Sequence, residues 1–139
     1  RKFNKADLII LEGWCVGSKP INPNFLKKNI NDLEKIEDSN LLWRTAYNKA
    51  LVEYQKVFKK FSYFIFIKIP NWKFVIDWKY KQELGLRSSN SNNHLKKKLY
   101  RFIQFYEKLS KWMFLTSPSD CNVLITLDKK QTAKKITYK

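Results

Sequence analysis

Cysteine and long hydrophobic runs are both scarce in this sequence. Cys15 and Cys121 are its two cysteines, and neither belongs to a CxxC or Cys/His spacing, so the sequence indicates neither a disulfide framework nor a zinc site. No apolar run approaches the roughly 20 residues that span a bilayer, and no cleavable signal pattern is present. We therefore expect a cytoplasmic protein without membrane contact. Because the sequence begins at Arg1 and not at methionine, we also expect it to be incomplete at its N-terminus.

Acidic residues are few, and arginine is rare among the basic ones. The chain has 28 basic and 12 acidic residues and a net charge of +16 at pH 7, but only four of the basic residues are arginine. A basic surface attracts phosphate, which keeps a nucleic-acid-binding module open as an alternative. Arginine is preferred over lysine for reading bases and for bidentate phosphate contacts. The lysine-rich composition therefore favours solvated lysines over a dedicated nucleic-acid surface.

The hydrophobic pattern alternates between apolar runs typical of buried strands and longer segments with helical spacing. The strand candidates are residues 7–11, 63–70 and 122–127, with the basic tail 128–139 as a further edge strand. Apolar residues spaced by three and four predict helices over 26–36, 41–61, 71–86 and 95–115. Ser39 or Asn40 can cap the second of these helices. This alternation predicts one α/β domain over residues 1–139 with a parallel sheet.

Two of the three glycines lie in one short stretch, DLIILEGWCVGSKP, at residues 7–20. Glu12 directly follows the first strand candidate, and open α/β folds bind ligands beyond the carboxyl ends of their strands. A carboxylate there can orient a magnesium-bound water or a substrate hydroxyl. Gly13 and Gly17 permit sharp turns and a close approach to a ligand, and Trp14 can form an apolar wall. From spacing alone, it is equally open that the glycines only turn the chain and that Trp14 only packs.

Five blocks then occur in order along the chain: EGWCVG, INDLE, WRTAYNKALVEYQ, WKYKQE and FIQFYEKLSKWM. In this combination, the sequence from about Asp7 to Asp128 resembles the C-terminal two-thirds of the D-glycerate 3-kinase type of P-loop kinases, relatives of phosphoribulokinase, uridine kinase and pantothenate kinase. The resemblance implies a three-layer α/β fold, a parallel sheet flanked by helices, here incomplete at the N-terminus. It also implies a lid-like segment at about residues 71–94.

The resemblance implies a chemistry as well: ATP-dependent phosphorylation of a small hydroxy acid in the presence of Mg²⁺, with D-glycerate as the expected acceptor. The family carries its glycine-rich phosphate loop and catalytic aspartate upstream of the EGW strand, and no G-x-x-x-x-G-K-[ST] motif occurs in this sequence. Without the amides and lysine of that loop, charge in the transition state is largely unstabilised. We therefore expect this chain to be inactive alone and to be part of a longer kinase.

Position by position, the resemblance also implies roles around the opening stretch. Glu12 would be the catalytic residue that faces the metal or the acceptor. Gly13, Trp14, Cys15 and Gly17 would shape the acceptor pocket. The resemblance assigns no metal ligand of the protein's own.

Two further groups of residues complete the predicted site. Arg44 and Asn48 lie four positions apart on one predicted helix and are candidates to hold a substrate carboxylate, with a surface arginine beside a helix start as the competing interpretation. The residues implied to close over ATP are Lys79, Lys81, Gln82 and Arg87. At Lys79 and Lys108 the family usually carries arginine, and lysine keeps the charge but loses the planar bidentate grip.

Two alternatives to the kinase remain at this point. A nucleic-acid-binding module predicts lysines and exposed aromatic residues gathered on one face, with salt-sensitive binding. A non-catalytic scaffold derived from a kinase would keep the fold without the activity. The sequence leaves open the exact hydroxy acid, the hydroxyl that is phosphorylated and the oligomeric state.

Overall fold

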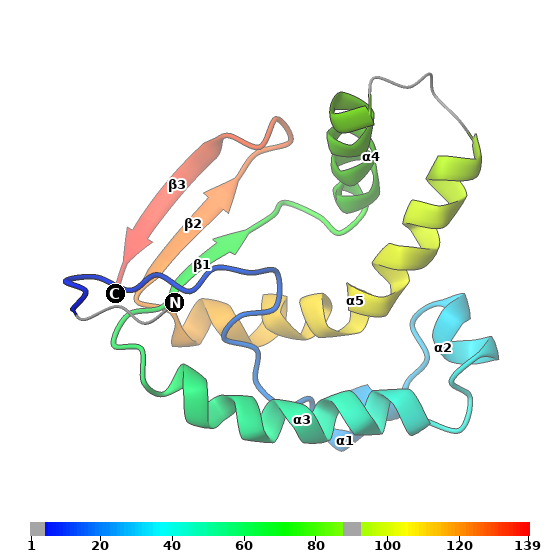
Figure 1. The fold of residues 1–139 in the computed structure, drawn as a ribbon, viewed down its shortest axis with the longest axis horizontal. Helices are drawn as coiled ribbons and strands as arrows, with labels where there is room; N and C mark the ends of the chain where they lie inside the picture. Colours follow the sequence, from blue (N-terminus) through cyan, green and yellow to red (C-terminus); the bar gives the residue numbers. More distant parts are fainter. Residues whose placement is uncertain (1–4, 88–92) are drawn as a thin grey trace.

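The centre of the fold is a mixed three-stranded sheet, shown in Figure 1. A computed structural model describes residues 5–87 and 93–139, except for the side chains of residues 86, 87 and 93. In the sheet, β1 (Ile65–Lys68) runs parallel to β2 (Val123–Leu127), which pairs antiparallel with β3 (Ala133–Tyr138). The basic tail is therefore the edge strand that was predicted. The expectation of a fully parallel sheet is wrong for β3, because a short turn after β2 sends the chain straight back.

Besides the sheet, the described part of the chain contains five helices: α1 (Pro23–Lys27), α2 (Asp32–Ile36), α3 (Leu42–Phe58), α4 (Phe74–Arg87) and α5 (Asn93–Asp120). The predicted helix over 26–36 is two short helices. Lys28 is extended, and the Asn31 side chain caps a new start by accepting from the backbone N–H of Glu34 at 3.0 Å. Apolar spacing does not reveal such a restart.

The structure differs from expectation at residues 7–11, which form no strand. Leu8, Ile9 and Ile10 are exposed, and no strand of the described part pairs with this segment. An apolar run becomes a strand only when a neighbour pairs with its backbone N–H and C=O groups. The prediction of a buried strand at residues 7–11 is therefore wrong for this structure, because no strand of the described part lies beside the run to pair with it.

Helix α5 covers one face of the sheet, and α3 lies on the side of α5 away from the sheet (Figure 1). The contact between α5 and the sheet is a core of Phe66, Met113 and Cys121. Phe66 is the buried residue of β1, whereas its neighbours Ile65 and Ile67 point to the opposite face and are exposed. Among the described residues, that second face of the sheet is therefore open.

A buried charge cluster of Arg44, Asp38, Glu34 and Lys108 joins the helices to one another. The Arg44 guanidinium of α3 is fully buried and donates from Nε to Asp38 Oδ2 at 2.7 Å. Its Nη1 donates to the carbonyl of Leu26 at 3.2 Å, and its Nη2 donates to the carbonyls of Glu34 and Asp38 at 3.3 and 2.6 Å. One side chain thus fixes α1, α2 and the start of α3.

Asp38 also caps α3, together with the predicted Asn40, whose Oδ1 accepts from the backbone N–H of Leu42 at 3.4 Å. The Asp38 carboxylate accepts from the backbone N–H groups of Trp43 and Arg44 at 2.8 and 3.2 Å. The formal N-cap, Leu41, has a left-handed φ of 66° and no side-chain hydrogen bond. A carboxylate that caps a helix and pairs with a buried arginine carries two roles at once.

Lys108 extends the buried charge cluster to α5. Its ammonium lies 3.2 Å from Glu34 Oε2 and donates to the carbonyls of Phe25 and Lys28 at 3.0 and 2.5 Å. Burial lowers the pKa of Lys108, and the charge of Glu34 opposes this shift. Two cations and two carboxylates therefore compensate one another where α1, α2, α3 and α5 meet.

We predict that Asp38→Ala destabilises the protein strongly. The substitution leaves the Arg44 guanidinium buried without its carboxylate and removes the Asp38 cap of α3. Breaking a buried ion pair by removing one partner costs about 3–5 kcal/mol. Urea unfolding followed by circular dichroism measures the loss.

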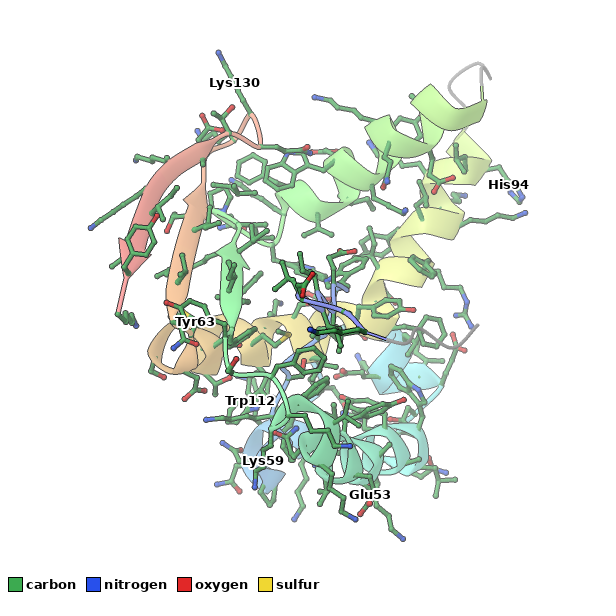
Figure 2. The ribbon with its side chains drawn as sticks, turned by 60° about the vertical axis from the view of Figure 1, so that its left-hand side comes forward. Glu53, Lys59, Tyr63, His94, Trp112 and Lys130 are labelled. Atoms are coloured by element: carbon green, nitrogen blue, oxygen red, sulfur yellow. The ribbon has the colours of Figure 1, made fainter. Side chains whose placement is uncertain are left out.

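Glu53→Ala is the matched control, because Glu53 forms an exposed ion pair with Lys56 on the outer side of α3, where Figure 2 labels it. Exposed pairs contribute less than about 1 kcal/mol. An equally small loss for Asp38→Ala would show that the buried charge cluster does not hold the helices together.

Candidate functional site

The stretch that carries both glycines forms a tight turn over residues 14–17 that packs against the beginning of β1. The Ser18 hydroxyl donates to the carbonyl of Cys15 at 2.7 Å and closes the turn. Gly17 has a φ of 81°, and a Cβ on it would lie 2.8 Å from the ring of Phe64. Both the backbone conformation and the contact with Phe64 therefore require glycine at this position. This packing role does not depend on a ligand.

Trp14 is held between α5 and the segment that follows β1. Its indole N–H donates to the Ser110 hydroxyl at 2.9 Å, and its ring stacks on Tyr106 with centroids 5.0 Å apart and planes at 12°. Trp72, four residues beyond the end of β1, lies 6.4 Å away by ring centroids. The Trp14 side chain therefore reaches toward the carboxyl end of β1, where α/β folds place ligands.

Glu12 precedes this turn and is exposed. Its carboxylate has no hydrogen-bond or ion-pair partner among the residues that the structure describes. It is therefore available to a ligand next to Trp14, whose side chain is 41% exposed. The catalytic role of Glu12 stays a prediction, as do the roles of Gly13, Trp14, Cys15 and Gly17 in acceptor binding.

Cys15 is half-buried and packs against the core of Phe66, Met113 and Cys121. Burial raises the pKa of the Cys15 thiol to about 11. The thiol is therefore protonated near neutral pH and is a packing group, not a nucleophile. Cys15 and Cys121 are both free, as the sequence indicates.

Arg44 and Asn48 point into the protein interior. The competing interpretation of Arg44 as a surface residue is wrong, because its guanidinium is fully buried and bonded on all three nitrogens. The Asn48 amide accepts from the Ile21 N–H at 2.7 Å and donates to the Ile21 carbonyl at 3.0 Å. Both side chains fix the chain that leaves the turn, and a contact with a substrate carboxylate stays a prediction.

The predicted lid residues lie on α4. Lys79 pairs with Glu83 at 3.3 Å and donates to Gln82 Oε1 at 3.0 Å. Lys81 and Gln82 line a hollow of about 370 Å³ together with Trp78. The side chain of Arg87 and residues 88–92 of the lid-like segment lie outside the described part of the chain.

The opposite wall of this hollow comes from the turn between β2 and β3, at Lys129, Lys130 and Gln131. Figure 2 shows Lys130 at this turn, above the sheet. Sequence reasoning missed these residues as neighbours of the lid. In the sequence, these residues appear only as two lysines that follow a predicted strand. That pattern does not indicate that the β2–β3 turn lies beside α4.

Within residues 5–87 and 93–139, no group of three or more His, Cys, Asp or Glu side chains is placed to hold a metal ion. None of the helices in these residues is long and apolar enough to cross a membrane. The lack of such a cluster does not bear on a metal ion that a bound nucleotide would carry.

No family model matches the sequence. The uncharacterized kinase mug58 of Schizosaccharomyces pombe is 27% identical over 100 residues, which make up 70% of this chain and 35% of the S. pombe protein. The structure of D-glycerate 3-kinase from Cryptococcus neoformans var. grubii matches with a TM-score of 0.66 and 16% identity, over 98% of this chain and 51% of that one.

The chain thus spans about a third of the kinase that it matches in sequence and about half of the kinase that it matches in structure. Nearly all of its own residues take part in the structural match. The resemblance to the D-glycerate 3-kinase type of kinase, first indicated by five short sequence blocks, is confirmed as a similarity of fold.

Proposed function

We propose that this chain is the C-terminal part of an ATP-dependent kinase that phosphorylates a small hydroxy acid, with D-glycerate as the acceptor. The observation that carries the proposal is the match of 98% of the chain to a D-glycerate 3-kinase structure. In the complete kinase, a preceding segment supplies the phosphate loop and the catalytic aspartate and adds parallel strands to the sheet, with helices on both faces.

The site around Glu12 fits this chemistry. Phosphoryl transfer requires positioning of the acceptor hydroxyl and neutralisation of charge more than covalent catalysis. Glu12 offers an exposed carboxylate that can orient that hydroxyl or a water bound to Mg²⁺. The Trp14 ring, held by Ser110 and Tyr106, supplies a fixed apolar wall beside it.

The lid in this proposal is α4 with Lys79, Lys81, Gln82 and Arg87. Lys81 and Gln82 share a hollow with the lysines of the β2–β3 turn, and lysine side chains attract the phosphates of a nucleotide. ATP brings Mg²⁺ with it, which neutralises part of the phosphate charge when bound. The chain alone lacks the phosphate loop, so we propose that it is inactive without the preceding segment.

The chain joined to the segment encoded before Arg1 is expected to consume ATP when D-glycerate is supplied. ADP release in a coupled assay measures this activity. Glycerol, which lacks the carboxylate, and lactate, which lacks the second hydroxyl group, are the matched acceptor controls. ATP consumption that is the same with and without D-glycerate would exclude it as the acceptor, and turnover by the 139-residue chain alone would contradict the proposed need for the preceding segment.

We predict that Glu12→Gln in the joined protein lowers kcat by about 10²-fold or more, which is the usual contribution of a positioned acid or base. Urea unfolding should be nearly unchanged, because the Glu12 carboxylate is exposed. Glu53→Gln, an equally exposed change on α3, should leave kcat unchanged. If turnover survives in Glu12→Gln, Glu12 has no part in the reaction.

A further inference from the structure

The Trp14 indole is held from two directions, although 41% of the residue is exposed. Helix α5 supplies Tyr106, which stacks on the indole with planes at 12°, and Ser110, whose hydroxyl accepts from the indole N–H at 2.9 Å. Tyr106 and Ser110 lie four positions apart, so both project from one face of α5. Trp72 approaches from the segment after β1, with ring centroids 6.4 Å apart. Rotation of the indole would break the hydrogen bond and the stacking together.

The Ser110 hydroxyl is buried where an apolar side chain would normally lie. The residue is 3% exposed, and a buried hydroxyl is unfavourable unless it is hydrogen-bonded. Serine is also a weaker helix former than alanine, which differs from it only by the oxygen. The hydrogen-bond partner of this oxygen is the indole N–H of Trp14, 96 positions away in the sequence. The hydroxyl at this position of α5 therefore serves the orientation of Trp14.

Other side chains fix the backbone that leaves the turn. Gln55 donates from its amide to the carbonyl of Ser18 at 2.8 Å, and Lys19 pairs with Asp120 at 2.7 Å. These contacts hold the chain and do not involve the indole. Ser110, by contrast, bonds to the ring that lies beside the exposed Glu12.

We infer that Ser110 is a positioning residue that, through Trp14, limits the length of the acceptor. This inference rests on the proposed function, in which the acceptor lies beside Glu12 and against the Trp14 ring. A ring that cannot rotate leaves a space of one size, whereas a mobile ring can move aside for a longer molecule. A fixed Trp14 therefore favours a three-carbon hydroxy acid over sugar acids with a longer carbon chain.

The expected selectivity has a limited size. One carbon more or less in an apolar pocket changes kcat/KM by about 10- to 200-fold. Loss of the Ser110 hydroxyl should reduce the preference for the shorter acceptor within this range. The KM for ATP should not change, because the nucleotide is proposed to bind at α4 and the β2–β3 turn and not at Trp14.

Ser110→Ala in the joined protein tests the inference. D-erythronate, which has one CHOH group more than D-glycerate, is the longer acceptor. The ratio of kcat/KM for D-glycerate to kcat/KM for D-erythronate should fall at least ~10-fold, with the KM for ATP unchanged. An unchanged ratio overturns the inference.

Ser119→Ala is the matched control. Ser119 lies near the end of the same helix, is exposed, and donates to the carbonyl of Thr116 at 2.7 Å. Its substitution removes a serine hydroxyl from α5 without touching Trp14, so the ratio should stay the same. An equal fall of the ratio in Ser119→Ala and Ser110→Ala would assign the effect to the helix and overturn the inference.

A double-mutant cycle shows whether Ser110 acts through Trp14. Trp14→Phe removes the indole N–H, so adding Ser110→Ala to this variant should not change the ratio further. If Ser110→Ala lowers the ratio equally with Trp14 and with phenylalanine at this position, Ser110 acts by another route and the inference is wrong.

Hydrogen exchange gives a readout that does not depend on turnover. The indole proton of Trp14, assigned in NMR spectra by its loss in Trp14→Phe, should exchange at least ~10-fold faster in Ser110→Ala than in the unmodified protein, because hydrogen bonding protects an N–H group. Equal exchange rates contradict the proposed hold on the ring.

The two proposals can fail separately. ATP consumption with neither acid rejects the proposed function, and a role of Ser110 in acceptor choice is rejected with it. Turnover of D-glycerate with the same acceptor ratio in Ser110→Ala supports the kinase and rejects the role of Ser110.

Discussion

The rest of the structure depends on the buried charge cluster of Arg44, Asp38, Glu34 and Lys108. Charges of both signs are removed from water where four helices meet, and each is compensated by a partner or a backbone carbonyl. Such a cluster tolerates little displacement, because an unpaired buried charge is costly. It fixes α5 against α1 and α2, and α5 in turn supplies Ser110 and Tyr106 to Trp14 and Met113 to the sheet.

Much of the fold could be predicted, and the failures have definite physical causes. The strands around Phe66 and Leu124 and the helices α3, α4 and α5 follow from apolar periodicity, because each buries one face. The split at Asn31 could not be predicted, since it depends on a side-chain cap and not on hydrophobicity. Residues 7–11 carry the signal of a strand, but pairing requires a neighbour that periodicity along one chain does not supply.

The binding roles of the candidate site residues stay predictions, but the structure explains how several of them pack. Gly17 was correctly singled out, and the contact with Phe64, 47 positions later, explains why no other residue fits. The burial of Arg44 was not foreseen, because a charged side chain on an amphipathic helix is normally solvated. Its partner Asp38 lies just before the helix, and only the folded turn at Leu41 brings the carboxylate to the guanidinium.

Lys108 stands where the resemblance to D-glycerate 3-kinase-type kinases leads us to expect arginine. Lysine keeps the charge but gives up the planar bidentate grip. Here the ammonium donates to two carbonyls and faces one carboxylate, a task for a point charge. Both buried cations of the cluster thus have oxygen partners, whereas Glu34 Oε1 has no hydrogen-bond partner among the described residues. Exposed apolar residues lie beside the sheet, at Ile65, Ile67 and residues 8–11, and also on the helices, at Leu42 and Leu115. Exposure alone therefore does not single out one edge of the molecule, because scattered apolar residues are normal on a protein surface.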